Sequence, residues 1–110
     1  MIFDRQGNTT IITQESVSIA VFLERLHEKY EKFKSDNIII NLFSLDNITV
    51  NDLLEFSDIS RDHKKQKKSF VIVTNRISYD ELPDDLVVVP SLQEAFDIIE
   101  MDEIERDLGF

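Results

Sequence analysis

The sequence has no cysteine and no tryptophan, and only two glycines and two prolines among its 110 residues. Without cysteine, neither a disulfide framework nor thiolate chemistry is available. Gly7 and Gly109 stand at opposite ends of the chain and the G-x-x-x-x-G-K-[ST] pattern is missing, which excludes a phosphate-cradling glycine-rich loop. No run approaches the roughly 18 apolar residues that cross a membrane. These absences exclude redox-active thiol enzymes, nucleotide-binding P-loop proteins and membrane-spanning helices.

Groups suited to catalysis are also scarce. The two histidines, His27 and His63, occur in neither an H-x-H nor an H-E-x-x-H arrangement, and the H-x-H-x-D-H motif of metallo-β-lactamase-type hydrolases is missing. Carboxylates are plentiful, but none has the D-x-D-x-D-G spacing of a calcium loop. We therefore expect no enzymatic activity, no metal and no cofactor.

Charge is distributed unevenly along the chain. The net charge is −10, and residues 77–110 contain eleven Asp or Glu and a single Arg. This acidity disfavours nucleic acid as a partner, because phosphate contacts need an extended positive face. The basic run at residues 63–68 (HKKQKK) is expected to be a solvated helix end, where lysine offsets the negative pole of the helix. The first residues lack the pattern of a secretory signal, and a cytoplasmic location is expected.

Short β-prone segments alternate with amphipathic ones over a single domain, residues 1–110. The expected strands are residues 2–5, 9–13, 37–42, 70–74 and 86–89, and the expected helices are residues 16–34, 50–67, a single turn at 78–82, and 92–108. The order β-β-α-β-α-β-α-β-α predicts an α/β fold with a mixed, mostly parallel sheet of four or five strands that opens with a hairpin. The continuous apolar runs NIIINL and FVIVT predict adjacent central strands, and residues 86–89 predict a third buried strand.

The junction between the strand at 37–42 and the helix at 50–67 is rich in polar side chains. These are Asp46, Asn47, Thr49, Asn51 and Asp52. Thr49 is expected to cap the helix, with Asp52 in an imperfect capping box. Val50, Leu53 and Leu54 share the stripe expected to face the sheet. Phe56 and Ile59 fall beside that stripe and are hypothesised, with Tyr79, to be exposed apolar contacts for a protein partner.

The strand that feeds directly into a helix, together with the ending VVVPSLQEAFDII, resembles the STAS domain (sulfate transporter and anti-sigma factor antagonist). Family members commonly end with a strand, a short loop and a helix that begins x-x-E-A followed by an apolar residue, and SLQEAF at residues 91–96 is similar to that. The resemblance implies a STAS-like fold and a non-enzymatic regulatory role in binding another protein. It also implies a partner surface formed by residues 45–56 and the loop at 75–79, which would lie at one end of the sheet.

The diagnostic family motif, Asp-Ser-Ser/Thr-Gly at the start of the second helix, is missing here. On this pattern Leu45 takes the strand-end position, Thr49 the aspartate, Val50 and Asn51 the two hydroxyl positions, and Asp52 the glycine. In the family, a kinase-type anti-sigma factor phosphorylates that hydroxyl and so releases the partner. Asn51 cannot be phosphorylated, so binding at this junction is expected to work without the switch.

Two alternatives remain open from the sequence. The first is homo-oligomerisation, including a homodimer, through an apolar stripe at Met101, Ile104, Leu108 and Phe110. The second is a receiver-like domain that uses Asp46, a carboxylate at the end of a central strand. A receiver domain also needs an acidic pair after its first strand, where this chain has Asp4-Arg5. It further needs a lysine after its last full-length strand, where this chain has Val89-Pro90.

Overall fold

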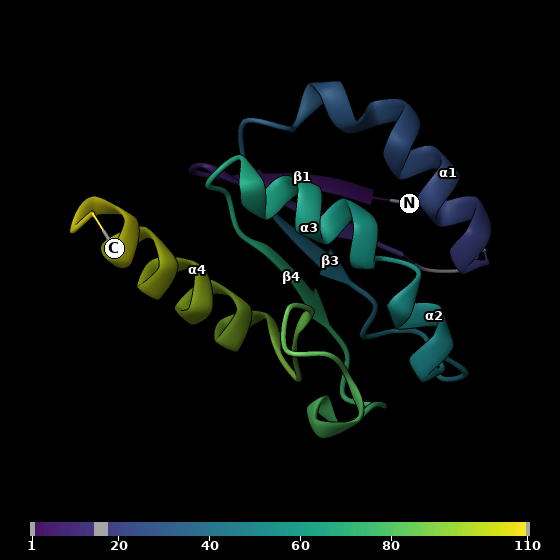
Figure 1. Ribbon diagram of the computed structural model, residues 1–110. Helices are drawn as coiled ribbons and strands as arrows, with labels where there is room; N and C mark the ends of the chain where they lie inside the picture. Colours follow the sequence, from purple (N-terminus) through teal and green to yellow (C-terminus); the bar gives the residue numbers. More distant parts are fainter. Residues whose placement is uncertain (1, 15–17, 110) are drawn as a thin grey trace.

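Five strands form one mixed sheet in the computed structural model, which describes residues 2–14 and 18–109. In spatial order they are β1 (Ile2–Gln6), β2 (Thr9–Thr13), β3 (Asn37–Asn41), β4 (Phe70–Val73) and β5 (Val87–Val89). β1 is antiparallel to β2, and the other neighbours are parallel (Figure 1). The predicted α/β class, the mixed sheet and the central, adjacent positions of β3 and β4 are confirmed.

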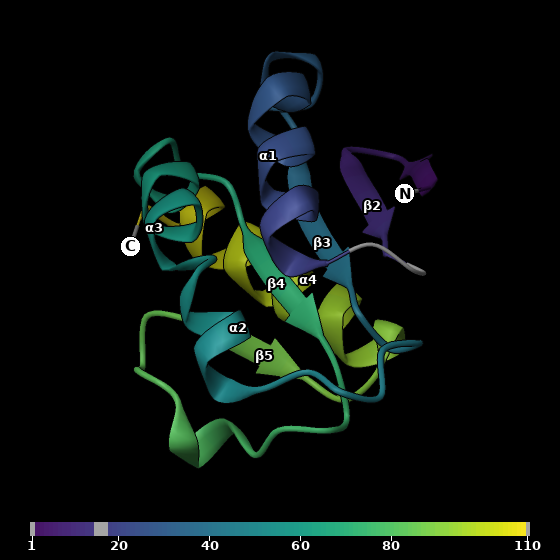
Figure 2. The ribbon, with the colours of Figure 1, turned by 90° about the vertical axis from the view of Figure 1, so that its right-hand side faces the viewer.

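Helices cover both faces of the sheet. On one face lie α1 (Ile19–Lys29), which continues into the 3₁₀ turn η1 (Tyr30–Lys32), then α2 (Val50–Leu54) and α3 (Ser57–Lys65). On the other face lies α4 (Leu92–Asp107) (Figures 1 and 2). A second 3₁₀ turn, η2 (Tyr79–Glu81), precedes β5. The sheet is thus the middle layer of three.

The alternation of side chains along β3 explains its continuous apolar sequence. Ile38 and Ile40 pack under α1–α3, whereas Ile39 packs under α4, and all three are fully buried. A strand covered on both faces favours apolar side chains on both, which is why β4 and the middle of β3 lack the polar–apolar alternation of a half-exposed strand. β5 is different: all three of its valines are half-buried, because β5 is an edge strand. The prediction of a third buried strand was wrong in this respect.

The helix predicted at residues 50–67 is two helices. α2 ends at Leu54 and α3 begins at Ser57, with Phe56 between them. The break turns the side chain of Phe56 into the core, where its ring meets that of Phe22 edge-on at 5.9 Å between centroids. Phe56 is fully buried and Ile59 nearly so, and Leu54 is 38% exposed. The predicted exposure of Phe56 and Ile59 and the predicted burial of Leu54 were therefore wrong.

α4 is uninterrupted, but its inward face changes from apolar to polar along its length. Ala95 and Ile99 pack on the sheet, whereas the second half is attached through polar side chains. Ser69 donates to the Asp102 carboxylate (2.7 Å), Asn37 donates to Glu103 (3.3 Å), and Arg106 reaches the oxygens of Ser69 and Asn37 (both 3.4 Å). The apolar stripe of this half therefore faces outward: Met101, Ile104 and Leu108 are 57%, 52% and 65% exposed. The predicted second stripe exists, and Phe110 lies outside the described residues.

Candidate functional site

The polar junction predicted from the sequence lies at the end of the sheet where the parallel strands finish, which we call the carboxyl edge; the opposite end is the amino edge. Parallel strands place their carboxyl ends together, and the loops that follow β3 and β4 run side by side at that edge (Figure 2). Asp46 accepts a hydrogen bond from Arg76 at 2.7 Å, and this ion pair joins the two loops. The predicted placement of residues 45–56 and of the loop at 75–79 at one end of the sheet is therefore confirmed, and their role as a partner surface stays a prediction.

Thr49 and Asp52 form the first turn of α2. The Thr49 hydroxyl oxygen accepts from the Asp52 backbone N–H (3.2 Å), and the Asp52 carboxylate accepts from the Thr49 backbone N–H (3.0 Å). This reciprocal pair is a complete capping box, which satisfies two amide groups that the helix itself leaves without partners. The predicted cap is confirmed, and both side chains are occupied in holding the helix.

Asn47 and Asn51 differ from these neighbours. Both are exposed, and within the part of the chain that the structure describes no hydrogen bond or ion pair holds either side chain. Each amide offers two N–H donors and a carbonyl acceptor to whatever approaches. A half-buried Asp52, as well as Asp46 and Asn47, lines a hollow of about 400 Å³ between this loop and the start of α1.

Of the two aromatic residues predicted to contact a partner, Phe56 does not support that expectation and Tyr79 is not tested. Phe56 belongs to the core, for the reason given above. The side chain of Tyr79 lies outside what the structure describes, although its backbone forms the start of η2. Within the described side chains, the predicted surface therefore consists of Asp46, Asn47 and Asn51 on a frame supplied by Thr49 and Asp52, and Tyr79 stays a prediction.

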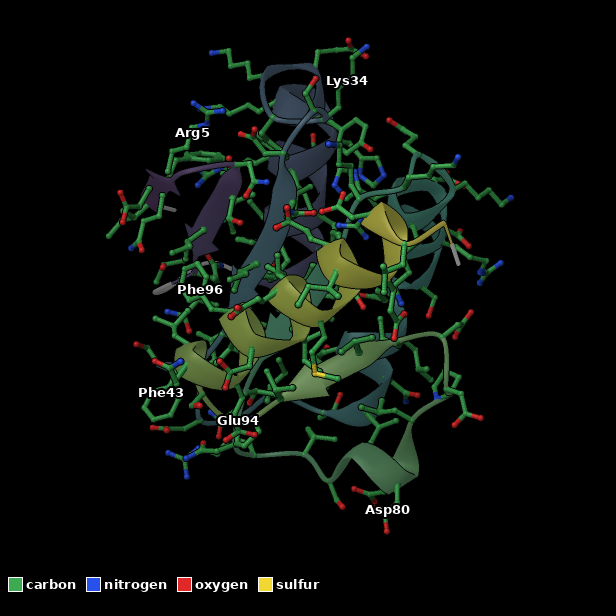
Figure 3. The ribbon with its side chains drawn as sticks, turned by 90° about the vertical axis from the view of Figure 1, so that its left-hand side faces the viewer. Arg5, Lys34, Phe43, Asp80, Glu94 and Phe96 are labelled. Atoms are coloured by element: carbon green, nitrogen blue, oxygen red, sulfur yellow. The ribbon has the colours of Figure 1, made fainter. Side chains whose placement is uncertain are left out.

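Sequence reasoning missed Phe43, an exposed aromatic side chain at this edge. Its ring is 50% exposed, and with Leu92 it borders a hollow of about 320 Å³. Phe43 projects outward because its backbone N–H donates to the side-chain oxygen of Asn41 (3.1 Å), which turns the chain as it leaves β3. Figure 3 shows Phe43 at the same end of the molecule as Glu94 of α4. The signal was present in the sequence as a phenylalanine between the apolar Leu42 and the polar Ser44.

The two histidines are not part of this edge. His27 is exposed on α1, where its Nδ1 lies 2.8 Å from the Leu23 carbonyl oxygen. His63 is fully buried, with Nε2 at 2.8 Å from the Asp36 carbonyl oxygen and Nδ1 at 2.6 Å from the Tyr30 hydroxyl. Burial lowers the pKa of His63 below its ordinary value. The predicted basic run does lie at the end of α3, but its first residue belongs to the core.

Among residues 2–14 and 18–109, no three His, Cys, Asp or Glu side chains gather closely enough to hold a metal ion. No helix in those ranges combines the length and the apolar character needed to cross a bilayer. Comparisons with known proteins add no assignment, since no protein-family model and no curated protein matches the chain. Among the described residues, the carboxyl edge offers hydrogen bonding by the two asparagine amides, charged groups in the Asp46–Arg76 pair, and apolar contact by Phe43.

Proposed function

We propose that the protein is a non-enzymatic interaction module that binds another protein through the carboxyl edge of its sheet. The observation that carries this proposal is the state of Asn47 and Asn51: both are exposed and both lack partners within the described residues. Their neighbours Thr49 and Asp52 are held by the capping box. A surface whose frame is already ordered loses little conformational entropy on binding, which favours affinity.

Phe43 supplies the apolar part of the proposed surface. Aromatic side chains are enriched among the residues that dominate interface energies, particularly where polar groups surround them. Phe43 is half-exposed beside Leu92, and the polar Ser91 and Asn41 border the same hollow. The partner implied by this surface offers an apolar pocket or side chain for Phe43 and backbone or side-chain groups for the two asparagines.

The STAS-like resemblance remains part of the proposal. The strand order β1 to β5, the opening antiparallel hairpin and the S-x-x-E start of α4 support it. In that family the switch is a phosphorylated hydroxyl where this chain has Asn51. The nearby hydroxyl of Thr49 accepts the Asp52 backbone N–H. Binding is accordingly proposed to be constitutive, without control by phosphorylation at this edge.

A site-specific crosslinking experiment tests the proposal. A photoreactive amino acid at position 51 should capture one partner from native cells, whereas the same group at the exposed Glu24 of α1 should not. Phe43→Ala and Asn51→Ala should each reduce the yield of the crosslinked or co-purified partner, and Glu24→Ala should leave it unchanged. Equal capture from positions 51 and 24 would contradict the proposed surface.

Homo-oligomerisation is the second candidate function, and the exposed stripe of Met101, Ile104 and Leu108 on α4 favours it. The stripe lies on the outer face of α4, so a copy bound there would leave the carboxyl edge free. The receiver-like alternative gains no support from the site, because Asp46 is paired with Arg76.

A further inference from the structure

A separate hollow of about 510 Å³ lies at the amino edge of the sheet, away from the proposed partner surface. It is bordered by β1, β2 and the segment from α1 to β3, and its lining includes Phe3, Arg5, Lys29, Lys32, Phe33 and Asp36. Figure 3 shows Arg5 and Lys34 at one end of the molecule and Phe43, Glu94 and Asp80 at the other. The volume of the hollow falls within the range of small-molecule sites, about 300–1,000 Å³.

The apolar wall of this hollow is aromatic. The rings of Phe3 and Phe33 lie 5.7 Å apart between centroids, and Phe33 is buried while Phe3 is partly exposed. The ammonium group of Lys29 lies 5.3 Å from the centroid of the Phe3 ring. An apolar body in the hollow would therefore meet an aromatic wall with a cation at its rim.

Arg5 is held in one orientation by a nearly buried carboxylate. Its Nε and Nη2 donate to the two oxygens of Asp36, both at 3.0 Å, and the Thr10 hydroxyl donates to the same carboxylate at 2.8 Å. The Asp36 side chain is 10% exposed and that of Arg5 is 66% exposed. Because this contact uses one edge of the planar guanidinium, the second edge, formed by Nη1 and the remaining N–H of Nη2, has no partner within the described residues. Two parallel donors at that edge match the two oxygens of a second carboxylate.

Charge at the rim points to the same class of ligand. Lys29 and Lys32 add to Arg5, while Asp36 is already paired with Arg5 and Asp4 is the other carboxylate at the rim. The hollow therefore carries an excess of positive charge on a chain whose net charge is −10.

We propose that this hollow binds a small organic carboxylate with an aromatic or aliphatic body. The carboxylate accepts both hydrogen bonds of the free edge of Arg5, the body lies against Phe3, and Lys29 and Lys32 neutralise the charge. This site is independent of the proposed partner surface and requires no chemistry on the ligand.

Amide NMR of the intact protein at neutral pH tests the site with phenylacetate and 3-phenylpropionate. Both should cause saturable shifts at residues 3–5 and 33–36. Three matched compounds should not: phenylacetamide, which lacks the charge, phenethylamine, which reverses it, and acetate, which lacks the body. Absence of saturable shifts with both acids, or equal shifts with phenylacetamide, would overturn the proposal.

Variants identify the groups responsible. Arg5→Lys keeps a cation beside Asp36 but removes the second pair of donors, and should weaken phenylacetate binding about tenfold. The double substitution Lys29→Met and Lys32→Met leaves the Arg5–Asp36 contact intact and should also weaken binding, while Arg25→Met, at an exposed arginine of α1, should not. Folding of each variant is judged from its amide spectrum. Unweakened binding by a folded Arg5→Lys protein, or by a folded double variant, would overturn the assignment.

Discussion

At the scale of single residues, neighbours at the start of α2 have opposite roles. Thr49→Ala should lower the free energy of unfolding by about 1 kcal/mol, because the variant loses the hydrogen bond that the Thr49 hydroxyl accepts from the Asp52 backbone N–H. Asn51→Ala should change it by no more than about 0.5 kcal/mol, as for an ordinary surface position. Urea unfolding of the two variants measures both values. A strongly destabilised Asn51→Ala protein would assign Asn51 to the scaffold and remove the main support for the proposed function.

The surroundings of His63 determine its tautomer. The Asp36 carbonyl can only accept a hydrogen bond, so Nε2 of neutral His63 carries the proton and Nδ1 accepts from the Tyr30 hydroxyl. Gln66 in turn donates to the Tyr30 oxygen at 3.2 Å. Protonation would place a charge in this buried site, where burial and the nearby Lys68 both disfavour it and lower the pKa of His63.

Stability should therefore depend on pH through His63. The unfolded chain takes up a proton near the ordinary histidine pKa of 6.5, whereas the folded protein takes it up only at lower pH. The contribution of neutral His63 to the free energy of unfolding is fully present above pH 6.5 and is lost as pH falls below it. We expect the free energy of unfolding to decrease between about pH 7 and pH 5, and His63→Gln to remove most of that decrease. An equal decrease in both proteins would contradict this origin.

Asp36 gives a second pH range, below that of His63, in which the free energy of unfolding should decrease. Hydrogen bonds from Arg5, the larger effect, and from Thr10 hold the pKa of this carboxyl below its ordinary value of 3.8. Its contribution is present above that pH and is lost as pH falls below it. The two pH ranges are therefore separable in one series of unfolding curves.

How far these roles follow from sequence depends on how local their contacts are. The Thr49 cap was predictable, because its partner Asp52 is three positions away. The burial of His63 was not, because its partners Tyr30 and Asp36 are 33 and 27 positions away. Asn47 and Asn51 were predictable as exposed polar residues, whereas the pairing of Asp46 with Arg76 depended on the packing of two loops.

At the scale of elements, strands were easier to predict than helix boundaries. β3 and β4 have continuous apolar sequences that only a doubly covered strand explains. The break between α2 and α3 gave a weaker signal, since the only irregularity is that Phe56 and Ile59 fall beside the stripe of the preceding residues. It depends on the packing of Phe56 against Phe22 of α1, a tertiary contact.

The two halves of α4 are attached to the sheet in different ways. The apolar residues of its second half face outward, and Asn37 at the start of β3 connects that half to the sheet. The same side chain accepts the Ser69 backbone N–H at 2.9 Å. Asn37 therefore joins β3, the start of β4 and α4.

Asn37→Ala should consequently loosen α4 from one end. It leaves the buried Ser69 N–H without its acceptor, and we expect a loss of about 2 kcal/mol in unfolding free energy. Hydrogen exchange should accelerate at residues 101–107 more than at residues 95–99, which the apolar contacts of Ala95 and Ile99 still hold. Uniform acceleration along α4 would show that the polar contacts do not anchor its second half.

At the scale of the whole molecule, charge separates the proposed surfaces. The cationic rim of the ligand hollow is at the amino edge, and the partner surface is at the carboxyl edge. α4 covers the face between them with seven carboxylates and one arginine. Each proposed interaction is therefore expected to respond differently to salt: anion binding at the hollow should weaken with ionic strength, whereas contacts by Phe43 and the asparagines should change little.

Self-association through α4 should show the opposite response. Two copies paired by Met101, Ile104 and Leu108 would bury apolar surface but would bring two acidic helices together. Because salt screens that repulsion, dimerisation should strengthen as NaCl rises from about 0.02 M to about 0.5 M. Sedimentation velocity measures the dimer fraction.

The double substitution Met101→Gln and Ile104→Gln keeps the net charge and should give a monomer at both salt concentrations, whereas Val21→Gln, at an exposed apolar position on α1, should not. A wild-type protein that stays monomeric in high salt would leave the stripe without a self-association role, and dimers that persist in the double variant would place the interface elsewhere.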